Sequence, residues 1–418
     1  MMLALILSMT GCVRVTVDKN VSVADAPADT AVSSDDAPDS DASIEKPALR
    51  DTVASPDGLG EDAIIGACLN NRSINDQELF DTALTNFNAV TLENELKPDA
   101  MFGYNNDRPK AGSIHEEELD GQVIQVPTLD HSLADAMLER ILEWNRANPE
   151  RTVRVRGHVL VWHLQTPGWF FRTDYDPDKD YVTAEEMNRR LEWYIKSMLT
   201  YYTQEGSRYR GLFYAWDVVN EAVSDRTGGY RTEQSDWWNV YQSEEYIINA
   251  FCYANRYAPE DLALYYNDYN ECDKKKLGGI CTLISDVKNA DGTRLDGFGM
   301  QGHYSVNAPT AEMIADAART YSDAAGSVML TELDVKPSMF YDGTESGLEK
   351  ENIRQADYYK KIYDALRTLS AESVNIRGIS FWGVSDKYTW LTGAHPLLFD
   401  EDMKPKPAFD AFLTKAPQ

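Results

Sequence analysis

The sequence predicts a single (β/α)8 TIM barrel, and three observations lead to that fold class. From about residue 56, short apolar runs alternate eight times with stretches of helical periodicity, as strands and crossover helices do in such barrels. The runs are rich in β-branched and aromatic residues, which is typical of buried strands. Polar residues gather at the ends of the runs, and barrel strands end at one common mouth. We therefore expect one α/β domain over residues 56–418.

Eight apolar runs are expected as the barrel strands. In chain order they span residues 63–68, 89–92, 153–159, 213–219, 263–266, 298–301, 328–333 and 378–382. Helical patterns cover residues 133–148, 184–202, 243–257, 311–321, 352–370 and 407–413. About 360 residues are available, against roughly 250 in a typical barrel, so some connections must be long. The obvious insertions are 103–130, 222–242 and 336–350.

Residues 1–18 are expected to be a signal peptide with a lipobox. The apolar run at 3–7 is too short to span a bilayer and is typical of a signal peptide. The Met-Thr-Gly-Cys stretch that ends at Cys12 resembles the lipobox of bacterial lipoproteins, in which the cysteine carries the lipid. A plain secretion signal is the alternative. Both predict export, either to the bacterial cell surface through Cys12 or as a free extracellular protein.

Residues 19–55 are expected to be a flexible acidic linker. They contain no aromatic residue and bury too little apolar surface to offset their ordering entropy. The formal net charge of the whole chain is −28. A surface of this charge repels nucleic acid and anionic lipid and suits a neutral partner. We expect no nucleic-acid partner, and we expect a monomer.

The chain has five cysteines but no Cys-x-x-Cys pair, so a structural zinc site is not predicted. Export would permit disulfides, and Cys272 and Cys281 are the nearest pair by sequence. Only their geometry decides whether they bond.

Two strand ends carry an acidic side chain that is costly to bury. Asn220-Glu221 directly follows the fourth run, and the seventh run contains Glu332. Strands four and seven face each other across a barrel mouth, so the two carboxyl groups would point toward each other. Paired carboxyl groups with a sugar-sized gap suit glycoside hydrolysis. One is protonated to assist the leaving oxygen, and the other is ionised to attack the anomeric carbon.

The other strand ends are polar and aromatic together. Their Asn, Gln, His and Lys side chains could bond sugar hydroxyls, and their tryptophans could supply flat faces for pyranose rings. A metal site is the main chemical alternative. It would use Glu93, His158, Glu332 and Asp334, but these residues lack the i, i+4 spacing of helical metal ligands.

Four motifs at the strand ends belong together. They are Trp-Asp-Val-Val-Asn-Glu at 216–221, Thr-Glu-Leu-Asp-Val at 331–335, the block at 156–167 that begins Arg-Gly-His, and Trp-Gly-Val-Ser-Asp at 382–386. This set resembles glycoside hydrolase family 10, the endo-β-1,4-xylanase family, from about residue 60 to the C-terminus. The Asn-Glu pair is shared with the wider clan, including cellulases, whereas the 156–167 and 382–390 blocks are narrower. The resemblance implies no cofactor and no metal.

The resemblance also implies individual roles. Glu221 corresponds to the general acid/base and Glu332 to the nucleophile of a retaining mechanism, which requires carboxyl groups about 5–5.5 Å apart. Asn220 would bond the 2-hydroxyl of the sugar being cleaved. His303, oriented by Asp217, would hold Glu332 in place.

Further positions are expected to bind xylan or xylo-oligosaccharides. They are Glu93, Asn94, Lys97, His158, Trp162, Gln165, Asn267, Tyr269, Gln301, Trp382 and Trp390. In the family, Trp382 and Trp390 correspond to an aromatic wall that leaves no room for a hexose hydroxymethyl group.

Three departures from the family pattern bear on substrate preference. Pro98 stands where Trp is usual, Gly302 stands where Ser is frequent, and the 103–130 connection is long. For 103–130 we favour a solvated surface excursion over an additional wall of the substrate cleft. Two alternative functions remain, a β-1,4-glucanase of the same clan and a non-catalytic xylan-binding surface lipoprotein.

Overall fold

The computed structural model describes residues 46–338, 341 and 343–413. The predicted signal peptide and lipobox, with Cys12, and most of the predicted linker lie outside these residues. Within the described part, no helix combines the length and the apolar character needed to cross a membrane.

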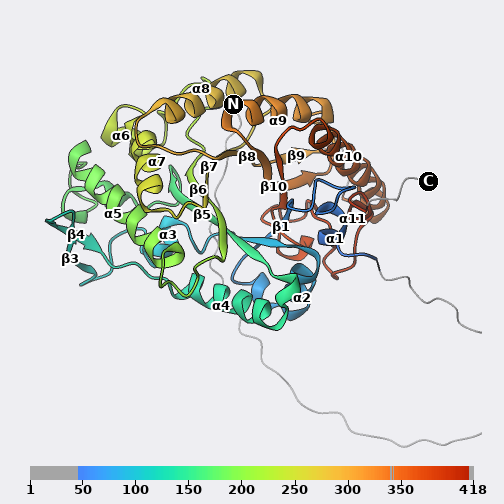
Figure 1. The fold of residues 1–418 in the computed structure, drawn as a ribbon, viewed down its shortest axis with the longest axis horizontal. Helices are drawn as coiled ribbons and strands as arrows, with labels where there is room; N and C mark the ends of the chain where they lie inside the picture. Colours follow the sequence, from blue (N-terminus) through green and yellow to red (C-terminus); the bar gives the residue numbers. More distant parts are fainter. Residues whose placement is uncertain (1–45, 339–340, 342, 414–418) are drawn as a thin grey trace, which may run out of the picture. The chain divides into compact units, whose positions relative to one another are not determined.

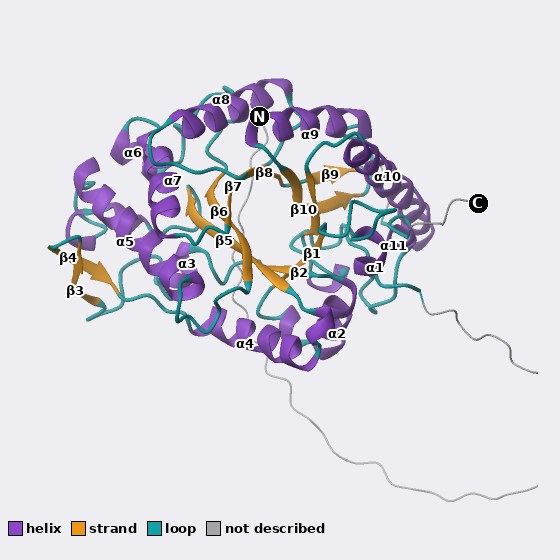
Figure 2. Cartoon of the chain, viewed as in Figure 1, coloured by secondary structure: helices purple, strands orange, loops and turns teal. Residues whose placement is uncertain are grey.

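Eight parallel strands close into a barrel (Figure 2). They are β1 (Ile64–Leu69), β2 (Ala89–Leu92), β5 (Arg154–Trp162), β6 (Phe213–Asn220), β7 (Ala263–Asp268), β8 (Gly297–Met300), β10 (Val328–Lys336) and β11 (Ile376–Phe381). The circle closes because β11 pairs with both β10 and β1. A short additional strand, β9 (His303–Ser305), pairs with the end of β10. Each predicted run coincides with one barrel strand, and the predicted fold class is confirmed.

Helices surround the barrel (Figure 1). The longer ones are α2 (Gln77–Asn86), α4 (Ser132–Ala147), α5 (Ala184–Thr203), α7 (Glu245–Tyr257), α8 (Lys274–Asn289), α9 (Ala311–Ala325) and α10 (Glu345–Ala371). The shorter ones are α1 (Leu49–Val53), α3 (Pro98–Met101), α6 (Asp236–Tyr241) and α11 (Pro407–Asp410). Side chains that accept a backbone N–H define several helix starts, among them Asp76, Thr183, Thr310 and Thr344.

The main core lies between the barrel and the helices, and a second small cluster fills one layer inside the barrel. The inner cluster consists of Ile64, Ala89, Ala215, Tyr265 and Met329. Successive inward positions on a strand are two residues apart, so Asp217 follows Ala215 on the same face of β6. The polar part of the barrel interior therefore begins one step above the apolar layer, toward the strand ends.

The predicted linker reaches too far into the folded domain. Residues 47–55 contain α1, whose Leu49 and Val53 side chains are fully buried. The Thr52 hydroxyl donates to the carbonyl oxygen of Phe412 at 3.2 Å, so this segment also contacts the C-terminal end of the domain. The composition of this segment did not indicate a helix, because only two apolar side chains, four residues apart, lie on the buried face of α1.

The 103–130 insertion contains an antiparallel hairpin of β3 (Ile114–Leu119) and β4 (Gln122–Pro127). Figure 1 shows the hairpin outside the helix ring, beside α5. The Trp193 indole of α5 donates to Glu117 at 2.9 Å. The insertion is a surface excursion packed on α5, which agrees with the favoured interpretation.

The four described cysteines, Cys68, Cys252, Cys272 and Cys281, are free thiols. Cys272 lies two residues before α8 and Cys281 lies within it, so the helix separates them by about 10 Å or more. That distance exceeds the reach of a disulfide. The nearest pair by sequence is therefore not a bonded pair.

Leu49→Ala should lower the free energy of unfolding by about 2–5 kcal/mol, because it leaves a cavity in the core. Urea unfolding of the variant and the wild type measures the difference. Glu61→Ala, at an exposed site, is the control and should stay within about 0.5 kcal/mol of the wild type. If both variants were as stable as the wild type, residues 47–55 would belong to the linker after all.

Candidate active site

Two glutamates meet at the barrel mouth through a shared hydrogen-bond network. Glu221 directly follows β6, and Glu332 lies in β10. Asn267 Nδ2 donates to Glu332 Oε1 at 2.7 Å and to Asn220 Oδ1 at 2.9 Å. Gln301 Nε2 donates to Asn220 Oδ1 at 3.3 Å and to Glu221 Oε1 at 2.9 Å. The amide oxygen of Asn220 accepts both of these bonds, which fixes the orientation of the amide group. The NH2 group of Asn220 then faces away from Asn267 and Gln301 and can donate to another group.

The Glu332 carboxylate is stabilised as an anion. Burial favours its neutral form, but the hydrogen bond from His303 Nε2, at 3.2 Å, and the nearby charges bring the pKa of Glu332 below its usual value. His303 Nδ1 lies 3.0 Å from Asp334 Oδ2. Burial would lower the pKa of His303, but Asp334 and Glu332 raise it to about 10. His303 is therefore a cation, whose Nε2–H donates to Glu332 and whose Nδ1 forms an ion pair with Asp334.

The predicted pairing of Asp217 with His303 is wrong. The Asp217 carboxylate forms an ion pair with Arg156 and lies 3.0 Å from His158 Nδ1. Strand register explains the difference. The pairing of β5 with β6 places His158 beside Asp217, whereas the pairing of β9 with β10 places His303 beside Asp334.

The surroundings of Glu221 have the opposite effect on its carboxyl group. Burial raises the pKa of Glu221, and the charges of Asp268 and Glu332 add to the increase. The hydrogen bonds from Gln301 and from Trp162 Nε1, the latter at 2.9 Å, offset only part of it. The pKa values of the two carboxyl groups are thus moved apart, as a division into acid and nucleophile requires.

A polar cluster lies at the ends of β2 and β5. Lys97 Nζ donates to Asn94 Oδ1 at 3.2 Å and to Gln165 Oε1 at 3.0 Å. It also lies 4.8 Å from the centre of the Trp162 ring. Glu93, next to Asn94, is only partly buried. The structure therefore brings these predicted sugar-binding residues to one side of the mouth.

Trp382 and Trp390 both pack against the ring of His303. Their ring centres lie 6.3 Å and 5.2 Å from it. Trp382 is buried, whereas Trp390 is 51% exposed. The Trp390 indole N–H donates to Asp334 Oδ2 at 2.8 Å. One aspartate therefore orients both His303 and the exposed tryptophan.

Four other predicted residues lie deeper or farther from the mouth. His158 and Gln301 are each 2% exposed, and they lie at the floor of the site. Asn267 is fully buried, and its amide oxygen accepts from Thr331 at 2.6 Å while its NH2 group donates twice. Asn267 therefore supports Glu332 from beneath and does not bind sugar, which corrects the prediction. The Tyr269 hydroxyl donates to Asp225, in a neighbouring charged cluster.

Two arginines contribute to the site but were not among the predicted residues. Arg156 pairs with Asp217, and a basic residue inside an apolar run was the signal that could have identified it. Arg231 Nε donates to the carbonyl oxygen of Glu221 at 2.8 Å. It lies in the 222–242 insertion, where nothing in the sequence distinguishes it from a surface arginine.

The residues of the alternative metal site have partners of their own. Glu332 bonds Asn267 and His303, and Asp334 contacts His303 and bonds Trp390. In the described ranges, no three or more His, Cys, Asp or Glu side chains are grouped so that they could hold a metal ion.

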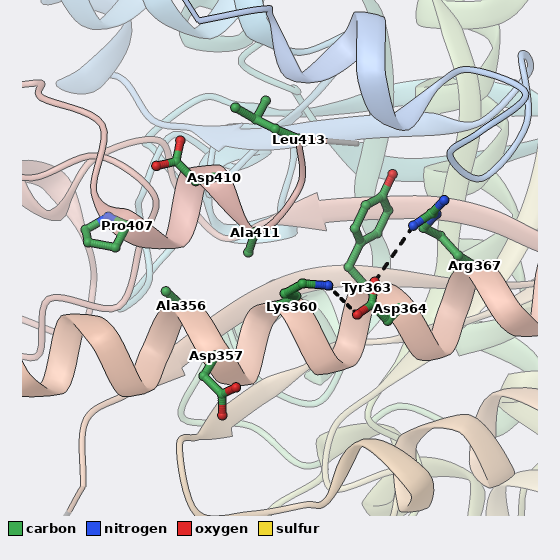
Figure 3. A pocket seen from close by; sticks show the side chains of 10 residues that line it. All are labelled: Ala356, Asp357, Lys360, Tyr363, Asp364, Arg367, Pro407, Asp410, Ala411 and Leu413. Carbon is green, nitrogen blue, oxygen red and sulfur yellow. Dashed lines mark hydrogen bonds and ion pairs between the residues drawn. The ribbon is translucent and has the colours of Figure 1, made fainter. Parts of the chain in front are cut away.

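Among the hollows outside the immediate site, two differ in whether they adjoin it. One of about 620 Å³ adjoins it and extends from His303 past Asn307 to Met313. Another of about 480 Å³ lies between α10 and α11, in the outer ring of helices (Figure 3). There Lys360 and Asp364 form an ion pair at 2.5 Å. Only the first hollow is continuous with residues around the two glutamates.

A barrel mouth that holds two carboxyl groups with oppositely shifted pKa values has the arrangement of a glycoside hydrolase. The model of glycosyl hydrolase family 10 matches residues 57–415. The chain belongs to this family, as the motifs predicted.

Named relatives agree with the family. Endo-1,4-beta-xylanase Y of Acetivibrio thermocellus is 34% identical over 373 residues, which are 85% of this chain and 31% of the relative. The endo-1,4-beta-xylanase of Geobacillus stearothermophilus is 31% identical, with 87% of this chain and 97% of the relative covered. This chain spans about a third of the first two curated relatives that it matches, at 31% of each.

A solved structure matches over most of the chain. It is the xylanase 10B of Clostridium thermocellum, comprising CBM22-1 and GH10 modules in complex with xylohexaose. The TM-score is 0.72 at 32% identity, with 89% of this chain and 68% of that chain covered.

Glu332→Gln should lower the pKa of Glu221, because it removes a neighbouring negative charge that favours the protonated form. An NMR titration of ¹³C-labelled glutamate carboxyl groups measures the shift. Glu117→Gln, in the exposed hairpin, is the control and should leave that pKa unchanged. An unchanged pKa in Glu332→Gln would mean that the two carboxyl groups do not interact.

Proposed function

We propose that this protein is an endo-acting, retaining xylanase that hydrolyses β-1,4-xylosidic bonds in xylan. The observation that carries the proposal is the opposite shift of two carboxyl pKa values, raised for Glu221 and lowered for Glu332. Such a pair supplies a proton donor and a nucleophile at the same pH. The names of the relatives support xylan as the substrate.

Two displacement steps account for hydrolysis. In the first, the Glu332 carboxylate attacks the anomeric carbon while Glu221 gives its proton to the leaving oxygen, and a glycosyl-enzyme forms. In the second, ionised Glu221 removes a proton from water, the water oxygen attacks the anomeric carbon, and Glu332 leaves. Two inversions retain the configuration. The NH2 group of Asn220 is available as a donor to the 2-hydroxyl.

The surrounding side chains suit neutral xylose units. Asn94, Lys97 and Gln165 offer donors and acceptors for ring hydroxyls, and the negative net charge of the protein suits an uncharged polymer. Trp382 and Trp390 form a wall on the other side, which disfavours the hydroxymethyl group of glucose. Initial rates on xylan and on a soluble cellulose derivative separate this proposal from a β-1,4-glucanase. Comparable rates would contradict the xylose preference.

Glu332→Ala should lower kcat on xylan by on the order of 10⁴-fold or more, as the loss of a nucleophile does in other enzymes. Binding of xylotetraose, measured by calorimetry, should remain. Glu312→Ala, at an exposed position on α9, is the control and should hydrolyse xylan at the wild-type rate. If Glu332→Ala turned over xylan at the wild-type rate, Glu332 would not be the nucleophile and would have no catalytic role.

The stereochemistry of the first product tests retention. Proton NMR of the wild-type reaction should show the β-anomer before mutarotation, because two successive inversions at the anomeric carbon restore the configuration of the substrate. An α-anomer as the first product would make the enzyme inverting.

We also propose that the protein is exported, held at the bacterial cell surface by a lipid on Cys12, and active as a monomer. The support for export and for the lipid anchor is the apolar run and lipobox-like stretch in residues 1–18. Labelled palmitate fed to expressing cells should enter the wild-type protein and not Cys12→Ser. Equal absence of label from both would favour a freely secreted protein.

A further inference from the structure

The peptide bond that follows Glu221 is held at both of its polar atoms. Arg231 Nε donates to the carbonyl oxygen of Glu221 at 2.8 Å, and the N–H of Ala222 donates to Tyr266 Oη at 3.0 Å. The N–H of Glu221 itself donates to the carbonyl oxygen of Asn267 at 2.9 Å. Glu221 has a φ of 56°, a left-handed conformation that a glutamate seldom adopts. These three bonds therefore hold an unfavourable backbone in place.

One of the holding groups, Tyr266, leads to a buried ammonium group. The Tyr266 hydroxyl donates to Asp268, and Asp268 Oδ1 lies 2.9 Å from Lys276 Nζ. Lys276 is 1% exposed and Asp268 is fully buried. Burial opposes the charge on Lys276, but Asp268 and Asp225 raise its pKa, so it remains an ammonium ion.

The other holding group, Arg231, leads to the same ammonium group. Arg231 Nη2 donates to Tyr269 Oη at 3.3 Å, and the Tyr269 hydroxyl donates to Asp225. Lys276 Nζ donates to Asp225 Oδ1 at 2.7 Å. The two paths therefore form a closed ring that passes through the Glu221 peptide and meets at Lys276.

The helix that carries Lys276 also supports the loop after β6. Lys276 lies in the first turn of α8. A Cβ on Gly279 of α8 would lie 1.8 Å from the carbonyl oxygen of Gly228, so the loop backbone rests directly on the helix. Glycine is required at position 279 for this close approach. The loop that leads away from Glu221 is thus fixed to α8 by packing and by the bond between Lys276 and Asp225.

We propose that Lys276 is a positioning residue for catalysis, which joins Asp268 on β7 to Asp225 in the loop after β6 and thereby fixes the direction of the Glu221 carboxyl group. This inference rests on the proposed role of Glu221 as acid/base. Lys276 is too deeply buried to touch substrate. Its loss leaves Asp268 and Asp225 without their shared cation and loosens the peptide after Glu221. Proton donation suffers first, because a general acid must lie within about 2.6–3.2 Å of the atom that it protonates.

Two substrates that differ only in the leaving group test the proposal. Phenyl β-xylobioside needs a proton on its leaving oxygen, whereas 2,4-dinitrophenolate leaves without one. In Lys276→Met, kcat/KM for the phenyl substrate should fall about 10–100-fold, because misplacing the acid removes only part of the roughly 10²–10⁴-fold that general acid catalysis contributes. For the dinitrophenyl substrate it should fall about threefold at most. An equal loss on both substrates, or no loss on either, would overturn the proposal.

Matched variants complete the experiment. Lys274→Met changes an exposed lysine in the same turn of α8 and should leave both kcat/KM values unchanged. Asp225→Asn opens the ring at a more exposed position, with 39% of the side chain accessible, and should give the same selective loss. If Lys276→Met does not fold, Asp225→Asn decides, and the absence of a selective loss there overturns the proposal.

Glu221→Ala distinguishes the two levels of the argument. It should show the selective loss at its largest, because it removes the acid itself. If Glu221→Ala shows no selective loss, the proposed function fails. If Glu221→Ala shows it and the ring variants do not, only the role of Lys276 fails.

Discussion

The burial of Glu332 as an ion determines how the rest of the site is built. Glu332 is 5% exposed, yet its pKa lies below the usual value, so protein groups must replace the water that a carboxylate normally binds. Asn267 and the cationic His303 supply the donors, and Asp334 keeps His303 charged. Because Asp334 also bonds Trp390, the charge on Glu332 and the position of the Trp390 indole depend on the same aspartate.

Glu221 requires the opposite, a raised pKa, and its surroundings at the same barrel mouth provide it. It receives neutral donors from Trp162 and Gln301 but no adjacent cation on its carboxyl group, so burial prevails and its pKa is raised. The amides of Asn267, Asn220 and Gln301 connect it to Glu332 in a fixed order of donors and acceptors. Substitutions within this relay should therefore affect both carboxyl groups together rather than add independently.

The barrel and the chemical character of its mouth could be predicted from the sequence, because strand periodicity and the residue types at strand ends are local properties. The partners of those residues could not. Which aspartate contacts His303 depends on the register between neighbouring strands. That register places Asp334 beside His303 and Asp217 beside His158. The depth of Asn267 and the reach of Arg231 from a distant part of a loop likewise depend on tertiary packing. Residues 47–55 were predicted as linker because a short helix with two buried apolar side chains hardly changes the composition of the segment.

The bond between Thr52 and Phe412 brings the two ends of the described domain together. In topological terms the chain is almost a closed loop, and only the cyclic order of the strands matters for the barrel. A short peptide could join the ends, and new ends could be opened at the Asp120-Gly121 turn of the outer hairpin. Such a circular permutant would keep every strand beside its present neighbours and leave the site intact. Its new N- and C-termini would lie at the tip of the outer hairpin.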